Sequence, residues 1–228
     1  MNNTYYMARL YTFLREIAAN NNREWLAANR RRYDDLRGAW LEDLDRLISL
    51  VREWEPACGP DARRAAYRFA RDTRFSPDKT PYKTFYSAAF GPRGRREPYA
   101  GYYIHIGIPG ESAIGDTGLY GGCYAPPSPV LRKLRHAIID NIEEWEEITS
   151  APELERLYPG WCGARLKTIP MGWDRNHPHA DILRLKDYGR FMPVGPEWWL
   201  DPSWPEKTAD ALRPLKPLID FLNYSIDE

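Results

Sequence analysis

The sequence predicts a single α+β domain with a mainly antiparallel sheet, formed by about residues 65–120 plus strands near residues 165–193. Apolar residues recur at helical spacing in the N-terminal, central and C-terminal parts of the chain. Residues 65–120 instead contain short runs that favour strands, of which the alternating YYIHIGI is the clearest. The turns between these runs are short, and short turns join antiparallel strands. No repeat or low-complexity linker divides the chain, so we expect residues 1–228 to form one domain in which helices pack on the sheet.

The N-terminal quarter of the chain is predicted to be helical. Helical spacing runs from Ala8 to Ala19, and the asparagines at 20–22 interrupt it and offer a cap for the next helix. A long helix is expected from Arg23 to Trp54, and Gly38 is the position where it could bend or divide. Pro56 ends it.

The sheet and the remaining helices follow in order. The predicted strands are AAYRFAR, TFYSAAF, YYIHIGI and SAIGDTGLY, with further β-like patches at ARLKTIP and DYGRFMPV. Within this part, GDTGLYGG (residues 115–122) is expected to form a turn between a strand and a helix, and PGE (residues 109–111) a turn between strands. A helical stretch is expected from Ser128 to about Thr149, and a last one from Glu206 to about Ile226 with interruptions at Pro214 and Pro217.

Composition limits the classes of protein to which the chain can belong. Aromatic residues make up 14% of 228 residues, which excludes disorder because so much aromatic surface must be buried. Lys and Arg number 32, as do Asp and Glu, so no net charge attracts nucleic acid or membranes to the whole molecule. Three scattered cysteines and the lack of a signal peptide or a membrane-spanning run predict a cytoplasmic protein with free thiols.

Charge is concentrated in YRFARDTRFSPDKTPYK, residues 67–83. Residues 63–83 contain seven basic and two acidic residues, a local charge of 7 − 2, or about +5. If this segment is a strand, Phe69 and Phe75 face the core with Arg71 between them. Arg68, Asp72 and Arg74 then lie on the polar face, and the proline-braced loop that follows presents Lys79, Tyr82 and Lys83 over a pocket.

This segment is interpreted as an anion site, with phosphate as the expected ligand. Arginine donates two hydrogen bonds to phosphate oxygens, and lysine adds a point charge. The candidate ligand-binding residues are Arg68, Arg71, Arg74, Lys79, Lys83 and Lys167. The candidate catalytic residues are Asp72 as a base or as a partner that orients an arginine, Tyr82 as a proton donor, and His177 as a general acid or base. The alternative is that the arginines form structural ion pairs and the lysines are solvated.

The same segment resembles the hallmark RxxRDxRFxxxKxxY of the bacterial family called domain of unknown function 2461. The matching residues are Arg68, Arg71, Asp72, Arg74, Phe75, Lys79 and Tyr82. The similarity includes an opening segment, residues 13–36, and a second basic segment with Lys167, Pro170, Gly172, His177, Leu183 and Lys186. GDTGLYGGCYAPP departs from the family pattern, where a more compact glycine turn is expected. The resemblance implies a single α+β domain and supplies no catalytic roles, because the family has no established activity.

We therefore expect an enzyme or enzyme-like domain that acts on a phosphate-bearing small molecule or a nucleotide. A non-catalytic module that binds nucleic-acid phosphates is the alternative, and it requires the basic surface to continue through Arg93, Arg95 and Arg96, which otherwise form a solvated hairpin tip. A third possibility is a purely structural motif. Asp174, His177, His179 and Asp181 lack a recognised zinc spacing, so no metal site is expected, and the sequence indicates no particular cofactor.

Overall fold

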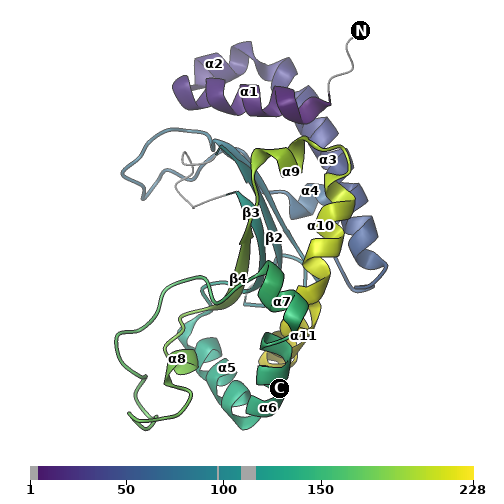
Figure 1. Ribbon diagram of the computed structural model, residues 1–228. Helices are drawn as coiled ribbons and strands as arrows, with labels where there is room; N and C mark the ends of the chain where they lie inside the picture. The colour runs from purple at the N-terminus through teal and green to yellow at the C-terminus, as the bar shows by residue number, and fades with distance from the viewer. Residues whose placement is uncertain (1–4, 97, 109–116) are drawn as a thin grey trace.

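A computed structural model describes residues 5–96, 98–108 and 117–228 and confirms the α+β fold. Four strands form one antiparallel sheet in the order β1-β2-β3-β4. They are β1 (Phe85–Phe90), β2 (Gly101–Gly107), β3 (Gly118–Cys123) and β4 (Tyr188–Pro193). Figure 1 shows the sheet at the centre, with the long N-terminal helix and the C-terminal helices along one face. The predicted PGE turn lies outside the described residues.

The N-terminal helices are α1 (Tyr6–Ala19), α2 (Arg23–Ala28) and α3 (Arg30–Arg52). The long predicted helix divides at Asn29 and not at Gly38, which lies inside α3 in open space. Asn22 caps α2, because its side-chain oxygen accepts a hydrogen bond from the Trp25 amide at 2.8 Å. The Asn29 side chain donates to the Trp25 carbonyl, so it bonds the backbone of α2 at the place where α2 ends.

The remaining helices follow the chain around the sheet. They are α4 (Ala62–Ala65), α5 (Ser128–Asp140), α6 (Ile142–Thr149), α7 (Pro152–Leu157), α8 (Ala180–Leu183), α9 (Pro196–Leu200), α10 (Trp204–Leu212), a 3-10 turn (Arg213–Leu215) and α11 (Lys216–Asp227). Pro214 and Pro217 interrupt the last helix as predicted, since Pro214 lies in the 3-10 turn and Pro217 in the first turn of α11. No helix of the described residues is long and apolar enough to cross a membrane.

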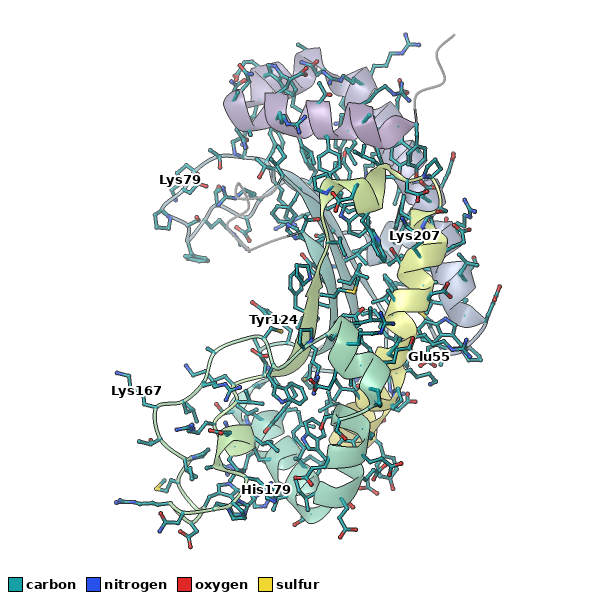
Figure 2. The ribbon with its side chains drawn as sticks, viewed as in Figure 1. Glu55, Lys79, Tyr124, Lys167, His179 and Lys207 are labelled. Atoms are coloured by element: carbon teal, nitrogen blue, oxygen red, sulfur yellow. The ribbon has the colours of Figure 1, made fainter. Side chains whose placement is uncertain are left out.

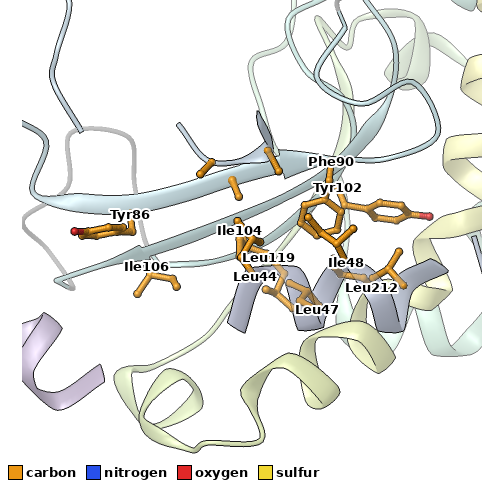
Figure 3. Packing of buried hydrophobic residues seen from close by; sticks show 14 of the residues in the cluster. Leu44, Leu47, Ile48, Tyr86, Phe90, Tyr102, Ile104, Ile106, Leu119 and Leu212 are labelled. Carbon is orange, nitrogen blue, oxygen red and sulfur yellow. The ribbon is translucent and has the colours of Figure 1, made fainter. Parts of the chain in front are cut away.

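The main core lies between the sheet and helices α3 and α10. Figure 3 shows Ile104 and Leu119 of the sheet beside Leu44 and Ile48 of α3, and all four are fully buried. Each such side chain contributes on the order of 2 kcal/mol when it leaves water. Strand alternation explains this layer, because every second residue of β2 points at the helices.

The opposite face of the sheet is rich in glycine, and we call it the glycine face. It consists of Phe85, Ser87, Ala89, Gly101, Tyr103, His105, Gly107, Gly118, Tyr120, Gly122, Gly189, Phe191 and Pro193. A Cβ atom on Gly118 would overlap the ring of Phe191, and one on Gly189 would overlap the ring of Tyr120. These two rings therefore occupy the space beside glycines of the neighbouring strand, where a side chain would otherwise stand.

The predicted strand AAYRFAR is not a regular strand. AAYRFAR pairs with β1 and with its own continuation only through isolated bridges, Ala66 with Ala88 and Ala70 with Tyr82. Phe75, predicted to face the core, is 93% exposed. The strand prediction fails because residues 71–81 leave the sheet as a loop, and Pro81 has no amide hydrogen to donate to a ladder.

Two other predictions near the sheet were also wrong. ARLKTIP is irregular and makes one bridge, between Arg165 and Leu185. Residues 118–122 of the predicted glycine-rich turn belong to β3, which confirms the strand predicted at SAIGDTGLY for residues 118–120, while residues 115–116 lie outside the described part. Glycines favour turns in general, but here they make room for aromatic rings on the facing strand.

Candidate functional site

The segment from Ala70 to Tyr82, which we call the basic loop, is shaped by bonds within itself. The Arg71 guanidinium bonds the Asp78 carboxylate and the Thr80 hydroxyl. Asp78 also accepts hydrogen bonds from the Thr80 amide at 2.9 Å and from its hydroxyl at 2.8 Å. The hydrogen bond from Arg71, followed by those from Thr80, lowers the pKa of Asp78 to about 2. The Arg71–Asp78 ion pair thus stabilises the conformation of the loop.

The tip of the basic loop forms a second internal set of bonds. Asp72 accepts hydrogen bonds from the Arg74 side chain at 3.0 and 2.7 Å, and these bonds lower the pKa of Asp72 to about 2. Lys79 donates to the Thr73 carbonyl at 2.9 Å. Figure 2 shows Lys79 on the loop that projects from the sheet. Four of the predicted site residues, Arg71, Asp72, Arg74 and Lys79, are therefore engaged inside the loop.

Lys83 lies in a different environment at the base of this loop. Its Nζ is 5.1 Å from the ring centroid of Tyr67 and 5.4 Å from that of Phe85. The side chain is half-buried, and in the described part of the chain no carboxylate pairs with it. Burial lowers the pKa of Lys83, and the positive charges of Arg68 and Arg95 lower it further.

Arg95 comes to this cluster from the turn between β1 and β2. Its guanidinium carbon is 4.2 Å from the centroid of the same Tyr67 ring. The carbonyls of Arg64 and Ala66 accept its hydrogen bonds at 2.8 and 3.2 Å, so its position is fixed by backbone. Arg68 makes a long contact of 3.7 Å with Asp72 and is otherwise directed to solvent. We call Arg68, Lys83 and Arg95 the cation cluster.

Two proton-bearing side chains of the glycine face adjoin the cation cluster. The Tyr67 ring contacts that of Tyr103 edge-on, with centroids 6.2 Å apart. The Tyr103 hydroxyl is 3.0 Å from Nδ1 of His105, which is 2% exposed. Burial and the nearby charge of Lys83 lower the pKa of His105 to about 4, so its imidazole is neutral at pH 7.

The other predicted site residues lie elsewhere. Tyr82 stacks on Phe69 at 5.8 Å, and its backbone groups bond the side chain of Asn21. Figure 2 shows Lys167 on a loop at the opposite end of the sheet from Lys79, in the same region as His179. His177 neighbours His179 there, with ring centroids 5.7 Å apart. The fold therefore separates Lys167 and His177 from the basic loop.

The acidic and histidine side chains around His177 do not form a metal centre. His177 Nδ1 accepts a hydrogen bond from the amide of His179, and Asp181 pairs with Arg184. Among residues 5–96, 98–108 and 117–228, no group of three or more His, Cys, Asp or Glu side chains is arranged to hold a metal ion.

The sequence interpretation included Lys83 and Arg68 and missed most of their neighbours. The sequence predicts Arg95 mainly as part of a solvated turn and does not place Tyr67, Tyr103 or His105 in the site. A usable signal was present in YYIHIGI, because alternation places Tyr103 and His105 on the same face of one strand. Alternation does not say which face is turned away from the helices.

Comparison with known proteins gives a family and no further relative. A family model described as conserved hypothetical protein (DUF2461) matches residues 9–221, most of the chain. Neither the curated proteins nor the solved structures contain a match.

Proposed function

The chain belongs to the DUF2461 family of conserved hypothetical proteins, and we propose that it binds a phosphate-bearing small molecule at the cation cluster. The family description names no activity, so the proposal depends on the geometry of the site. The observation that carries it is the half-buried Lys83 between Arg68 and Arg95, with no carboxylate paired to it in the described part of the chain.

An unpaired cation that leaves water costs free energy, and neighbouring like charges increase the cost. A bound anion offsets both contributions. Phosphate fits this set of donors because Lys83 supplies a point charge while each arginine supplies a planar fork. Tyr103 and the neutral His105 lie next to the cluster and are hydrogen-bonded to each other at 3.0 Å.

A small molecule is favoured over a nucleic-acid strand because the basic surface is interrupted beyond Arg95. Arg93 pairs with Asp227, and Arg96 lies over the ring of Tyr99 at 5.6 Å. A strand-binding surface would need a continuous run of free cations along the backbone path.

Thermal unfolding in the presence of ligands tests the proposal. Inorganic phosphate, sugar phosphates, mononucleotides and single-stranded oligonucleotides are added separately at fixed ionic strength. We expect phosphate compounds to raise the Tm of the unaltered protein and Lys83→Met to abolish that shift. Lys133→Met, at an exposed lysine of α5, is the matched control and should retain it.

Arg71→Met separates the cation cluster from the basic loop. It should keep most of the phosphate shift, since Arg71 is bonded to Asp78 and Thr80. An equal shift in the unaltered protein and in Lys83→Met would refute the cation-cluster site. A shift with oligonucleotides alone that vanishes as salt rises would instead support the nucleic-acid module.

A further inference from the structure

A second polar site lies at the other end of the glycine face, where β4 begins. Asp187 immediately precedes β4 and is 7% exposed. Its Oδ1 is buried without a hydrogen-bond partner, and no cation of the described residues pairs with the carboxyl group. Glu206 also has an unpartnered buried oxygen, but its other oxygen is paired with Arg46. Asp187 has no such compensation.

The backbone around Asp187 is arranged to admit the carboxyl group. Gly163 has a φ of 94°, and a Cβ atom there would overlap the carboxylate oxygens of Asp187. The adjacent Cys162 bonds the Gly189 carbonyl through its amide and through its Sγ, at 3.1 Å in each case. The segment at Gly163 is therefore fixed to β4, and the space beside it is occupied by the carboxylate.

Tyr120 brings a second unpartnered polar atom to the same place. Its hydroxyl lies over Gly189, two residues from Asp187, and this buried oxygen also has no hydrogen-bond partner. Burial raises the pKa of Tyr120 strongly and the charge of Asp187 raises it further, so the phenol keeps its proton. The Tyr120 hydroxyl and Asp187 Oδ1 do not bond each other.

Cys162 is not the reactive group of this site. Burial, followed by the charge of Asp187, raises the pKa of its thiol to about 11. A nucleophilic cysteine needs the opposite shift. The chemistry available is hydrogen bonding and proton transfer through oxygen.

We propose that Asp187 and Tyr120 form a second binding site, which takes an uncharged hydroxyl group of a ligand such as a sugar or nucleoside. One hydroxyl oxygen accepts the proton of Tyr120, and its own proton is donated to Asp187, so both buried groups acquire a partner. A phosphate group would be repelled by the carboxylate. An ammonium group has no acceptor for the Tyr120 proton.

The raised pKa of Asp187, about 6, agrees with this geometry because its carboxyl can exchange a proton near neutral pH. The hydroxyl site does not depend on the phosphate site. A ligand with a phosphate at one end and hydroxyls at the other would use both sites, but each can be tested alone.

The test is an NMR titration at pH 7.5 with phosphate-free ribose and adenosine, and with ethylamine as the charged comparison. Saturable shifts are expected for amides near residues 161–163 and 187–190 with ribose or adenosine. Affinity should fall at least tenfold in Asp187→Asn and in Tyr120→Phe. Asp140→Asn, which alters an exposed aspartate at the end of α5, should bind as the unaltered protein does.

Each contrary result has a definite meaning. Shifts that rise linearly without saturation, or a titration that the two site variants leave unchanged, would overturn the proposal. Saturation by ethylamine alone would replace the hydroxyl ligand with an amine and would equally overturn it. The phosphate-induced Tm shift, measured in Asp187→Asn, separates this site from the cation cluster, because that shift should persist.

Discussion

At the scale of single residues, the contacts of a charged side chain indicate its role better than its type. Arg71 and Lys83 belong to the same basic segment, yet Arg71 is bonded to Asp78 and Thr80. Lys83 contacts aromatic rings and is surrounded by like charge. We therefore assign Arg71 to the support of the loop and Lys83 to ligand binding. Asp187 is the acidic counterpart of Lys83, a charged group buried without a partner.

The unpaired carboxyl of Asp187 predicts a pH-dependent loss of stability. Burial raises its pKa from 3.8 to about 6 in the folded state, so folding favours the protonated form. Below pH 3.8 the Asp187 carboxyl is protonated in both states, and the full free energy of unfolding is present. Part of that free energy is lost as the pH rises through 6, because Asp187 then ionises in the folded state. A shift of about two pKa units corresponds to a cost of roughly 3 kcal/mol at most when Asp187 is ionised.

Asp187→Asn should therefore be more stable than the unaltered protein at pH 8, and the difference should shrink towards pH 5. Urea unfolding at the two pH values measures it. The neighbouring titratable groups, Tyr120, Cys123 and Cys162, remain neutral over this range because burial raises their pKa values. Asp140→Asn should show no such trend. A variant less stable at both pH values would mean that Asp187 has a structural partner.

At the scale of elements, the sequence predicts regular periodicity well and irregular segments poorly. The predicted strands TFYSAAF and DYGRFMPV contain β1 and β4, and YYIHIGI contains β2 except for Gly101, because alternation with one buried face leaves a clear pattern. Residues 67–83 contain a similar alternation, but the carboxylates of Asp72 and Asp78 accept hydrogen bonds from the amides of Arg74 and Thr80, and these bonds stabilise a loop instead. The spacing of apolar residues along the sequence does not reveal this competition between side-chain hydrogen bonds and strand pairing.

The candidate site was predictable in part for the same reason. Lys83 and Arg68 stand out by their charge, whereas Arg95, Tyr103 and His105 join them through sheet pairing and a turn. No pattern in the sequence identifies Asp187 and Tyr120 as site residues, because an unpaired carboxylate is recognised only when its surroundings in the fold are known.

The packing of rings across the glycine face makes a prediction about β4. Gly189→Ala should destabilise the protein by about 1–3 kcal/mol, because the new methyl group overlaps the ring of Tyr120. Gly38→Ala is the opposite case: this glycine lies inside α3, and a methyl group there would meet no neighbouring side chain or element within 4 Å. It should stabilise the protein by about 0.5–1 kcal/mol through helix propensity.

Chemical denaturation of the two variants measures both effects. A double variant that combines Gly189→Ala with Tyr120→Ala should lose less stability than the sum of the single changes, because the overlap is then removed. Strictly additive losses would show that the ring does not limit residue 189.

At the scale of the whole molecule, two asparagines tie the ends of the chain to the sheet region in the same way. Asn21, between α1 and α2, donates to the Tyr82 carbonyl at 2.9 Å and accepts from the Tyr82 amide at 3.0 Å. Asn223 of α11 accepts from the Ala100 amide at 2.8 Å and donates to the Ala100 carbonyl at 3.2 Å. Each side chain thus pairs with one residue of the backbone as a neighbouring strand would. The first tie holds the base of the basic loop, and the second holds the start of β2.

Asn223→Ala tests whether the second tie contributes to the cooperative stability of the molecule. The Asn223–Ala100 bonds are buried, so the change leaves an amide and a carbonyl of Ala100 without partners, at a cost of about 2–4 kcal/mol. The better helix propensity of alanine offsets only about 0.5 kcal/mol. Asn141→Ala, which removes one exposed bond to the Ala137 carbonyl, should cost less than about 1 kcal/mol. Calorimetric unfolding of both variants gives the comparison, and equal losses would mean that water replaces the bonds to Ala100.

If the tie joins α11 to the sheet as one cooperative unit, Asn223→Ala should lower the Tm of a single transition instead of producing a separate early one.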